Sequence, residues 1–153
     1  MDATHANDLA GNQNAPPACW MTDIFWVVLV DGENSGGGYS VVEQWMRGGT
    51  SLPLHAHAAT DEWFNVIEGE MEVQMLDERI TVKAGESVWI PRRTLHGFKV
   101  TSRVCKVLNG YTPGGIRQLV HGTPERTNGV GCRPARLRGA EIPALPIIPR
   151  RRR

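Results

Sequence analysis

Residues 49–69 read GTSLPLHAHAATDEWFNVIEG and contain three side chains that can bind a metal, His55, His57 and Glu62. In a β-strand, residues two apart point to the same face, so the two imidazoles are expected to project side by side. The turn residues AATD follow, and an apolar run begins after Glu62, a pattern that predicts a hairpin with the carboxylate beside the imidazoles. We therefore expect three ligands to converge from two neighbouring strands.

A fourth ligand is offered by His96, within the sequence IPRRTLHGF, because this segment follows another apolar run bounded by turn residues. The imidazole could close the site from the opposite side. Three imidazole nitrogens and one carboxylate oxygen suit Fe(II), Mn, Ni, Cu or Zn better than they suit Ca or Mg. Each residue alone has a plainer explanation, since histidines in strands and glutamates in hairpins usually bind no metal.

At these residues the sequence resembles the cupin superfamily. The first cupin motif, G-x5-H-x-H-x4-E-x6-G, is matched by Gly49, His55, His57, Glu62 and Gly69. The second motif, G-x5-P-x-G-x2-H-x3-N, is matched by Gly85, Pro91 and His96, but has Arg93 in place of glycine and Val100 in place of asparagine. The resemblance implies an all-β, cupin-type jelly-roll barrel that binds one divalent transition metal ion, Fe(II), Mn, Ni or Zn. The ligands that it implies are His55, His57, Glu62 and His96.

The strand pattern of the whole chain agrees with an all-β fold, because apolar or alternating runs of four to eight residues recur at short intervals. The expected strands include IFWVVLV, YSVVEQWM, MEVQML, RITV, SVWI, LHGFKV and RVCKVLN. Asp77 and Glu78 are expected to form a two-residue hairpin turn, and Gly49, Gly69 and Gly85 to end strands at positive φ. Three tryptophans, Trp45, Trp63 and Trp89, are interpreted as core residues.

The 153 residues fit one domain, for which we expect a flexible N-terminal segment 1–18, a barrel 19–120 and a Pro/Arg-rich extension 121–153. Residues 116–153 carry nine arginines and two glutamates, a net charge of +7, so the other residues carry −6. The terminal arginines lack interleaved aromatic residues, so no nucleic-acid partner is expected. The longest apolar run, residues 24–30, is shorter than the roughly 20 residues that span a membrane, so no membrane partner is expected.

The three cysteines have no metal-site or disulfide spacing, which favours no disulfide framework and a cytoplasmic location. The strand IFWVVLV is expected to be either buried on both faces or added to a sheet across a dimer. Because it is long and apolar for a sheet edge, we expect a homodimer that buries it.

Strand parity places Phe64 on the same side as Glu62 and Phe98 on the same side as His96, so the cavity should be apolar or aromatic. Arg93 lies within reach of the barrel mouth, where it would orient an anionic or phenolate substrate. The resemblance to quercetin dioxygenase-like cupins favours a metal-dependent dioxygenase that acts on a small aromatic, phenolic or enolic molecule. Glu62 would serve both as ligand and as catalytic base.

Two other functions stay open. A non-redox cupin enzyme, such as a lyase, isomerase, decarboxylase or polyketide-type cyclase, would use the same metal as a Lewis acid. A small-molecule binding module would use the barrel without catalysis. The identity of the metal and the need for oxygen would distinguish the three functions.

Overall fold

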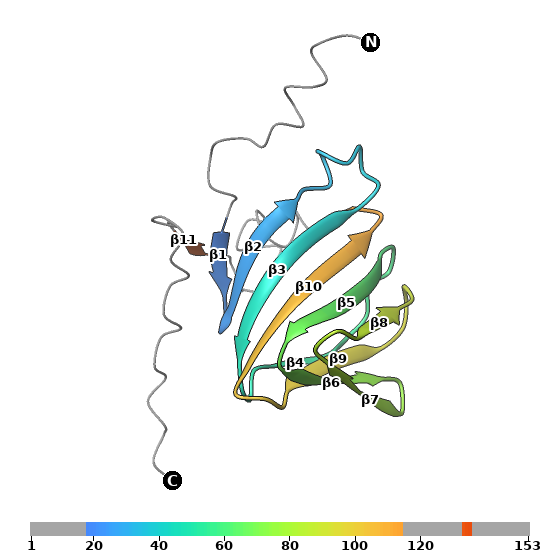
Figure 1. Ribbon diagram of the computed structural model, residues 1–153. Helices are drawn as coiled ribbons and strands as arrows, with labels where there is room; N and C mark the ends of the chain where they lie inside the picture. Colours follow the sequence, from blue (N-terminus) through green and yellow to red (C-terminus); the bar gives the residue numbers. More distant parts are fainter. Residues whose placement is uncertain (1–17, 115–132, 136–153) are drawn as a thin grey trace.

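The computed structural model describes residues 18–114 and 133–135, which form eleven β-strands and no helix (Figure 1). The strands are β1 (Ala18–Met21), β2 (Ile24–Val30), β3 (Ser40–Arg47), β4 (Ser51–His55), β5 (Asp61–Glu68), β6 (Glu70–Met75), β7 (Glu78–Lys83), β8 (Ser87–Ile90), β9 (His96–Val100), β10 (Val104–Thr112) and β11 (Arg133–Ala135). The described part of the chain accordingly has no helix that could cross a membrane.

The strands form two antiparallel sheets that lie face to face, as Figure 1 shows. The seven-stranded sheet has the order β11-β1-β2-β3-β10-β5-β8, and the four-stranded sheet has the order β4-β9-β6-β7. Every strand pair runs antiparallel. This architecture confirms the predicted all-β class and the jelly-roll type of barrel.

The hydrophobic core fills the space between the two sheets. Strands β3 and β5 bury every second residue, as the period-two sequence pattern predicts. Each sheet contributes side chains to one buried cluster, for example Val42, Phe64, Val66, Val107, Met71, Val73, Phe98 and Val100. The barrel is therefore held by residues that alternate with the solvent-facing side chains of the same strands.

The prediction that the two halves of the 49–69 segment form a hairpin is wrong. Strand β4 pairs with β9 in the smaller sheet, whereas β5 pairs with β10 and β8 in the larger one. The chain crosses from one sheet to the other between His55 and Asp61, and the buried side chains of β5 pack against those of the smaller sheet. The candidate ligands consequently approach one another across the barrel and not along one hairpin.

The strand IFWVVLV is not at a sheet edge. This strand, β2, pairs with β1 on one side and with β3 on the other, and its first five residues are buried on both faces. Because both edges are already bonded within the chain, the edge argument for a homodimer fails. The homodimer itself stays a prediction.

The hairpin between β6 and β7 is displaced by one residue from its predicted position. Met75 pairs with Glu78, so the two turn residues are Leu76 and Asp77, and Leu76 has a positive φ of 52°. A two-residue turn with positive φ at its first position matches the twist of an antiparallel hairpin. The prediction that three glycines end strands at positive φ is confirmed, because φ is 89° at Gly49, 82° at Gly69 and 89° at Gly85.

All three tryptophans project from the face of the larger sheet opposite the cluster between the sheets. On that face Trp45 packs against a second buried cluster of Ala18, Phe25 and Val27, as a core residue does, whereas Trp63 is half-buried and Trp89 is 52% exposed. Trp63 lies directly opposite Trp89, across the β5–β8 pair. Alternation with the buried neighbours Phe64 and Val88 fixes this orientation.

The cysteine prediction is also wrong. Cys19 is disulfide-bonded, whereas Cys105 is a free and buried thiol; Cys132 lies outside the described residues. Burial, with a smaller contribution from Glu68, raises the pKa of the Cys105 thiol to about 11. The cysteines therefore give no support for a reducing compartment, and the cytoplasmic location stays a prediction.

The expected flexible segment 1–18 and the extension 121–153 fall almost entirely outside the described residues. Within the extension, β11 pairs with β1 and continues the larger sheet by one short strand. The roles of the terminal arginines and of the apolar segment near the C-terminus stay predictions.

Candidate metal centre

Four side chains from both sheets meet at one end of the barrel. His55 is the last residue of β4 and lies opposite His96, the first residue of β9, in the smaller sheet. Glu62 is the second residue of β5 in the larger sheet, and His57 lies in the connection between β4 and β5. The four ligand atoms, one from each side chain, all lie within 4.8 Å of one another. The structure thus brings together all four residues that the sequence motifs single out.

Backbone carbonyl groups orient two of the imidazoles. Nδ1 of His55 lies 2.9 Å from the carbonyl oxygen of Pro53, and Nδ1 of His96 lies 2.8 Å from that of Thr94. Since a carbonyl only accepts, each Nδ1 carries the proton and donates it. Nε2 of His55 is then left with a lone pair, which is the form of histidine that binds a metal. Nε2 of His96 lies 2.8 Å from Oε2 of Glu62 and donates to that carboxylate, so a metal bound there would displace its proton.

The carboxylate of Glu62 has two oxygens in different surroundings. Oε2 lies 3.1 Å from Nε2 of His57 and 2.8 Å from Nε2 of His96, so it faces the ligand nitrogens. Oε1 instead accepts a hydrogen bond of 2.9 Å from Nδ2 of Asn109. One oxygen is therefore free for a metal while the other is fixed by the protein.

The electrostatics of the centre keep Glu62 ionised. Burial by itself would raise its pKa, but hydrogen bonds with His57, His96 and Asn109 outweigh burial and lower the pKa to about 2. For His96, burial would lower the pKa, yet the hydrogen bonds with Glu62 and with the Thr94 carbonyl raise it overall. Burial lowers the pKa of His55, which favours the neutral, metal-binding imidazole.

Access to the centre is one-sided. Glu62 and His96 are 3% and 2% exposed, whereas His55 and His57 are only partly buried. A ligand from solvent would therefore approach along the side of His55 and His57. Glu62 and His96 form the inner wall.

Sequence reasoning missed the residues that hold Glu62 from behind. Asn109 also donates to the carbonyl oxygen of Trp63 at 3.1 Å, and its Oδ1 accepts a 3.0 Å hydrogen bond from Nε2 of Gln44. Tyr111 lies opposite Glu62 in the β5–β10 pair and is hydrogen-bonded to its carboxylate. A signal was present, because Asn109 and Tyr111 continue the inward-facing series of β10 that begins with the core residues Cys105 and Val107.

The phenol of Tyr111 is held in its neutral form. Burial, the negative charge of Glu62 and the hydrogen bond with that carboxylate raise the pKa of Tyr111 well above its usual value. Its ring meets the His57 ring edge to face, with the ring centres 5.8 Å apart. Tyr111 therefore contacts two of the four candidate ligands.

The backbone of Arg93 is hydrogen-bonded to His57, one of the four candidate ligands. Its N–H donates to the carbonyl oxygen of His57 at 2.8 Å, and its φ is 66°, a left-handed conformation that favours glycine. This angle explains why the second cupin motif has glycine at the position. The Arg93 side chain is exposed, whereas the guanidinium of Arg92 makes two hydrogen bonds with Asp61, at 3.0 and 2.8 Å.

The predicted pocket phenylalanines belong to the core cluster. Phe64 and Phe98 are 2% and 6% exposed, and their rings meet edge to face with centres 5.6 Å apart. Val100, where the second motif has asparagine, is 1% exposed and packs in the same cluster. A substrate role for Phe64 and Phe98 stays a prediction.

Comparison with known proteins supports the same fold. Residues 41–111 match the family described as Cupin domain. Quercetin 2,3-dioxygenase of Bacillus subtilis (strain 168) is 27% identical over 92 residues, which cover 60% of this chain. The chain spans only 27% of the length of that curated relative.

Two solved structures show the likeness in three dimensions. KdgF from Halomonas sp. has a TM-score of 0.56 at 19% identity, covering 61% of this chain and 81% of that one. A predicted oxalate decarboxylase from Thermotoga maritima has a TM-score of 0.59 at 15% identity, covering 67% and 96%. At these identities the likeness shows a shared fold.

Proposed function

This chain is a member of the cupin superfamily, and on that basis we propose that it is a metal-dependent dioxygenase for a small aromatic, phenolic or enolic substrate. The observation that carries the proposal is the cluster of His55, His57, Glu62 and His96, with ligand atoms within 4.8 Å of one another. The 27% identity with a quercetin 2,3-dioxygenase favours dioxygenase chemistry over other reactions of the same site.

The donor set fits a divalent transition metal. Three imidazole nitrogens and one carboxylate oxygen are borderline donors, and two of the rings already present Nε2 to the centre because Nδ1 is bonded to a carbonyl. A redox-active metal bound there would supply a Lewis acid for a substrate oxygen and an electron path for oxygen chemistry. His55, His57, Glu62 and His96 are the residues proposed to hold it.

The protein's own contribution begins with Glu62. The hydrogen bond from Asn109 fixes Oε1, so Oε2 points steadily toward the imidazoles. We also propose that Glu62 accepts the proton of a substrate hydroxyl, although its lowered pKa of about 2 makes it a weak base. The neutral Tyr111 hydroxyl beside it can share a hydrogen bond with the carboxylate during that transfer.

Arg93 is proposed to orient the substrate. Its side chain is exposed and forms no ion pair among the described residues, while the neighbouring Arg92 is already engaged with Asp61. A guanidinium presents planar paired donors that suit a phenolate or enolate oxygen. Phe64 and Phe98 are proposed as the apolar floor below the metal, which would exclude water from the substrate ring.

Elemental analysis of protein purified without added metal, followed by oxygen-uptake assays on phenols and enols, tests the proposal. We expect iron, nickel or manganese near one equivalent, and substrate-dependent oxygen uptake that the His57→Ala variant lacks. Turnover of the same substrate at an unchanged rate without oxygen would reject the dioxygenase and support a non-redox lyase or cyclase. Stoichiometric ligand binding with no turnover would support a binding module.

A further inference from the structure

A hollow lies at the end of the barrel opposite the metal centre. Its volume is about 660 Å³, and its lining comes from the β3–β4 and β9–β10 connections with the adjoining strand ends: Arg47, Gly48, Gly49, Lys99, Val100, Thr101, Ser102 and Arg103. In the β4–β9 pair, Ser51 lies opposite Lys99 at one end, and His55 lies opposite His96 at the other. The hollow and the metal ligands are therefore separated by roughly the length of a strand, about 10 Å.

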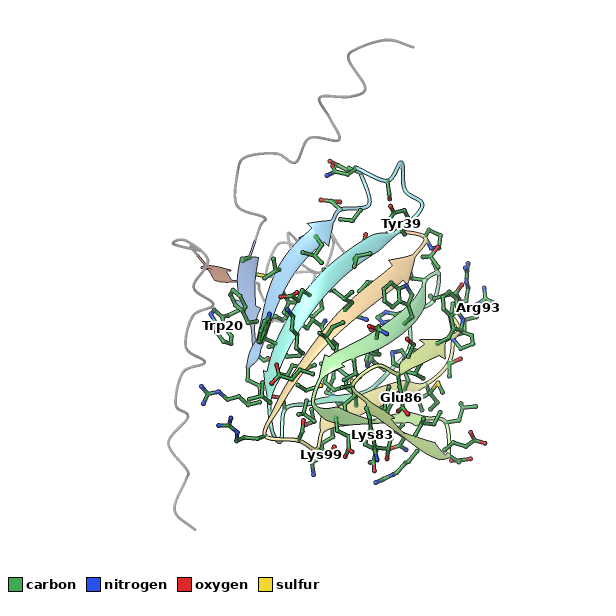
Figure 2. All side chains as sticks on the ribbon, viewed as in Figure 1. Trp20, Tyr39, Lys83, Glu86, Arg93 and Lys99 are labelled. Carbon is green, nitrogen blue, oxygen red and sulfur yellow. The ribbon has the colours of Figure 1, made fainter. Side chains whose placement is uncertain are left out.

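Figure 2 shows this separation, since Lys99 and Arg93 lie well apart on the barrel. Arg93 marks the metal end through its hydrogen bond with the His57 carbonyl. Lys99 lines the hollow at the other end. A molecule bound in the hollow would not contact the metal ligands.

Three of the lining side chains are cations that form no ion pair with any carboxylate of residues 18–114. Residues 18–114 contain eight lysines and arginines, and four of them form ion pairs: Arg79 with Glu72, Lys83 with Glu70, Arg92 with Asp61, and Lys106 with Glu43. Within that same part of the chain, the four unpaired cations are Arg93 at the metal end and Arg47, Lys99 and Arg103 around the hollow.

This clustering contrasts with the charge of the surrounding protein. Residues 1–115 carry a net charge of −6, so carboxylates are plentiful. Glu72 lies directly opposite Lys99 in the β6–β9 pair, yet its carboxylate is bonded to Arg79. Glu70 is close as well, but it accepts a hydrogen bond from the Thr101 hydroxyl and pairs with Lys83. The positive charge of the hollow is therefore left for a ligand from outside.

The backbone around the hollow is fixed before any ligand binds. The N–H of Gly48 donates to the carbonyl of Arg103 at 2.8 Å, and that of Gly49 donates to Val100 at 3.0 Å. A side chain at Gly48 would place its Cβ 2.6 Å from the Ser102 carbonyl oxygen, so only glycine allows this contact. At Gly49, φ is 89° and the space where a Cβ would stand is open, which leaves the hollow unobstructed.

We propose that this hollow binds a small organic phosphate, with Arg47, Lys99 and Arg103 around its phosphoryl group. Three cations that line one hollow favour a dianionic phosphate monoester, and the guanidinium groups of Arg47 and Arg103 can each bond two phosphate oxygens. The volume of about 660 Å³ exceeds that of a phosphate group alone and lies within the range of small-molecule pockets, so it leaves room for an organic substituent. The site is additional to the proposed metal-dependent activity.

Calorimetric titration of the full metal-loaded chain with glycerol 3-phosphate, at constant ionic strength, tests the site. We expect saturable binding of one equivalent, weakened about tenfold or more by Arg47→Ala and by Arg103→Ala, the loss expected when a charge-assisted hydrogen bond is removed. The matched control is Arg92→Ala, which removes an exposed cation bonded to Asp61 at the other end of the barrel and should change the affinity less than about twofold. Thermal unfolding of each variant verifies that the barrel is intact.

Two further measurements distinguish this site from its alternatives. His57→Ala, which disturbs the metal centre, should leave glycerol 3-phosphate binding unchanged; loss of binding there would place the phosphate on the metal and overturn the proposal. Equally tight binding of citrate would overturn the assignment to phosphates. The proposal also fails if no saturable binding is detected, if Arg47→Ala and Arg103→Ala bind as the parent does, or if Arg92→Ala weakens binding as much as they do.

Discussion

Asn109→Ala is the substitution that probes the inner support of the metal centre most directly. Asn109 is fully buried, and its amide connects three groups: it donates to Glu62 Oε1 at 2.9 Å and to the Trp63 carbonyl at 3.1 Å, and it accepts from Gln44 at 3.0 Å. Truncation to alanine removes all three hydrogen bonds. The carboxylate of Glu62 remains buried with one donor fewer.

The expected loss follows from these contacts. A hydrogen bond to a charged group contributes about 1.5–3 kcal/mol, and a buried polar group left unsatisfied costs about 1–3 kcal/mol. The second term applies to Gln44, because among the described residues its Oε1 has no hydrogen-bond partner and Asn109 is the one acceptor of its Nε2. Since neighbouring terms are not additive, we expect a loss of about 3–5 kcal/mol in the free energy of unfolding.

Urea denaturation of the metal-free protein measures this loss. The matched control is Asn65→Ala, in β5, whose amide donates to the hydroxyl of Ser87 at 2.8 Å near the surface. The control should lose less than about 1 kcal/mol, because water can replace an exposed partner. Metal affinity should also fall by about tenfold or more in Asn109→Ala, as for other residues that orient a ligand.

Equal losses in the two variants would refute the reasoning. Such a result would show that Glu62 and Gln44 find other partners when Asn109 is shortened. A large loss of stability with unchanged metal affinity would show that Asn109 supports the fold and does not orient the ligand. Only the combination of both effects agrees with the proposed role.

His57→Ala should remove most of the bound metal in elemental analysis while the far-ultraviolet circular dichroism of the barrel persists, because the core lies in the strands; full metal occupancy would contradict the ligand assignment. Arg93→Ala should raise the KM for a phenolate substrate about tenfold, the equivalent of about 1.4 kcal/mol. Arg92→Ala should leave the KM unchanged, because the Arg92 guanidinium is bonded to Asp61. Equal KM values for the two variants would show that Arg93 does not bind the substrate. The pKa of Glu62 is about 2 in the folded protein, compared with the ordinary value of 4.5 that applies to the unfolded chain. This difference contributes about 3 kcal/mol to the stability of the metal-free protein, which is complete above pH 4.5 and is lost as the pH falls toward 2. Relative to Glu62→Gln, the parent should therefore lose stability in acid, and parallel pH profiles would disprove this assignment. A homodimer is still expected, through the edge of the larger sheet where β8 exposes an indole; light scattering that finds a monomer at high concentration would exclude it.

The sequence alone predicts the fold class and the four candidate ligands because both are recorded in short-range patterns. Period-two burial in β3 and β5 is visible as alternating apolar residues. The glycines at positive φ are visible as strand ends, since other residues rarely adopt that conformation. The spacing of His55, His57 and Glu62 resembles a family motif, and His96 follows at the distance that the second motif requires.

The tertiary structure decides which strands become neighbours, and this depends on contacts between residues far apart in the sequence. Strand parity indicates that His55 and Glu62 each face the interior, but not that their strands, β4 and β5, belong to different sheets. The same limit applies to β2, because its unbroken apolar run fits both a strand buried on both faces and a strand paired across a dimer, and its pairing with β1 and β3 shows that it is buried within the chain.

The polar partners of the site were beyond sequence reasoning for the same physical reason. Asn109 reaches Glu62 from a residue 47 positions away, and Gln44 reaches Asn109 across 65 positions. The side chains of Arg47 and Lys99 likewise meet around one hollow because two loops are bonded backbone to backbone at the far end of the barrel. Local sequence determines what each strand can offer to the interior; only the packing of two sheets determines which of these groups meet.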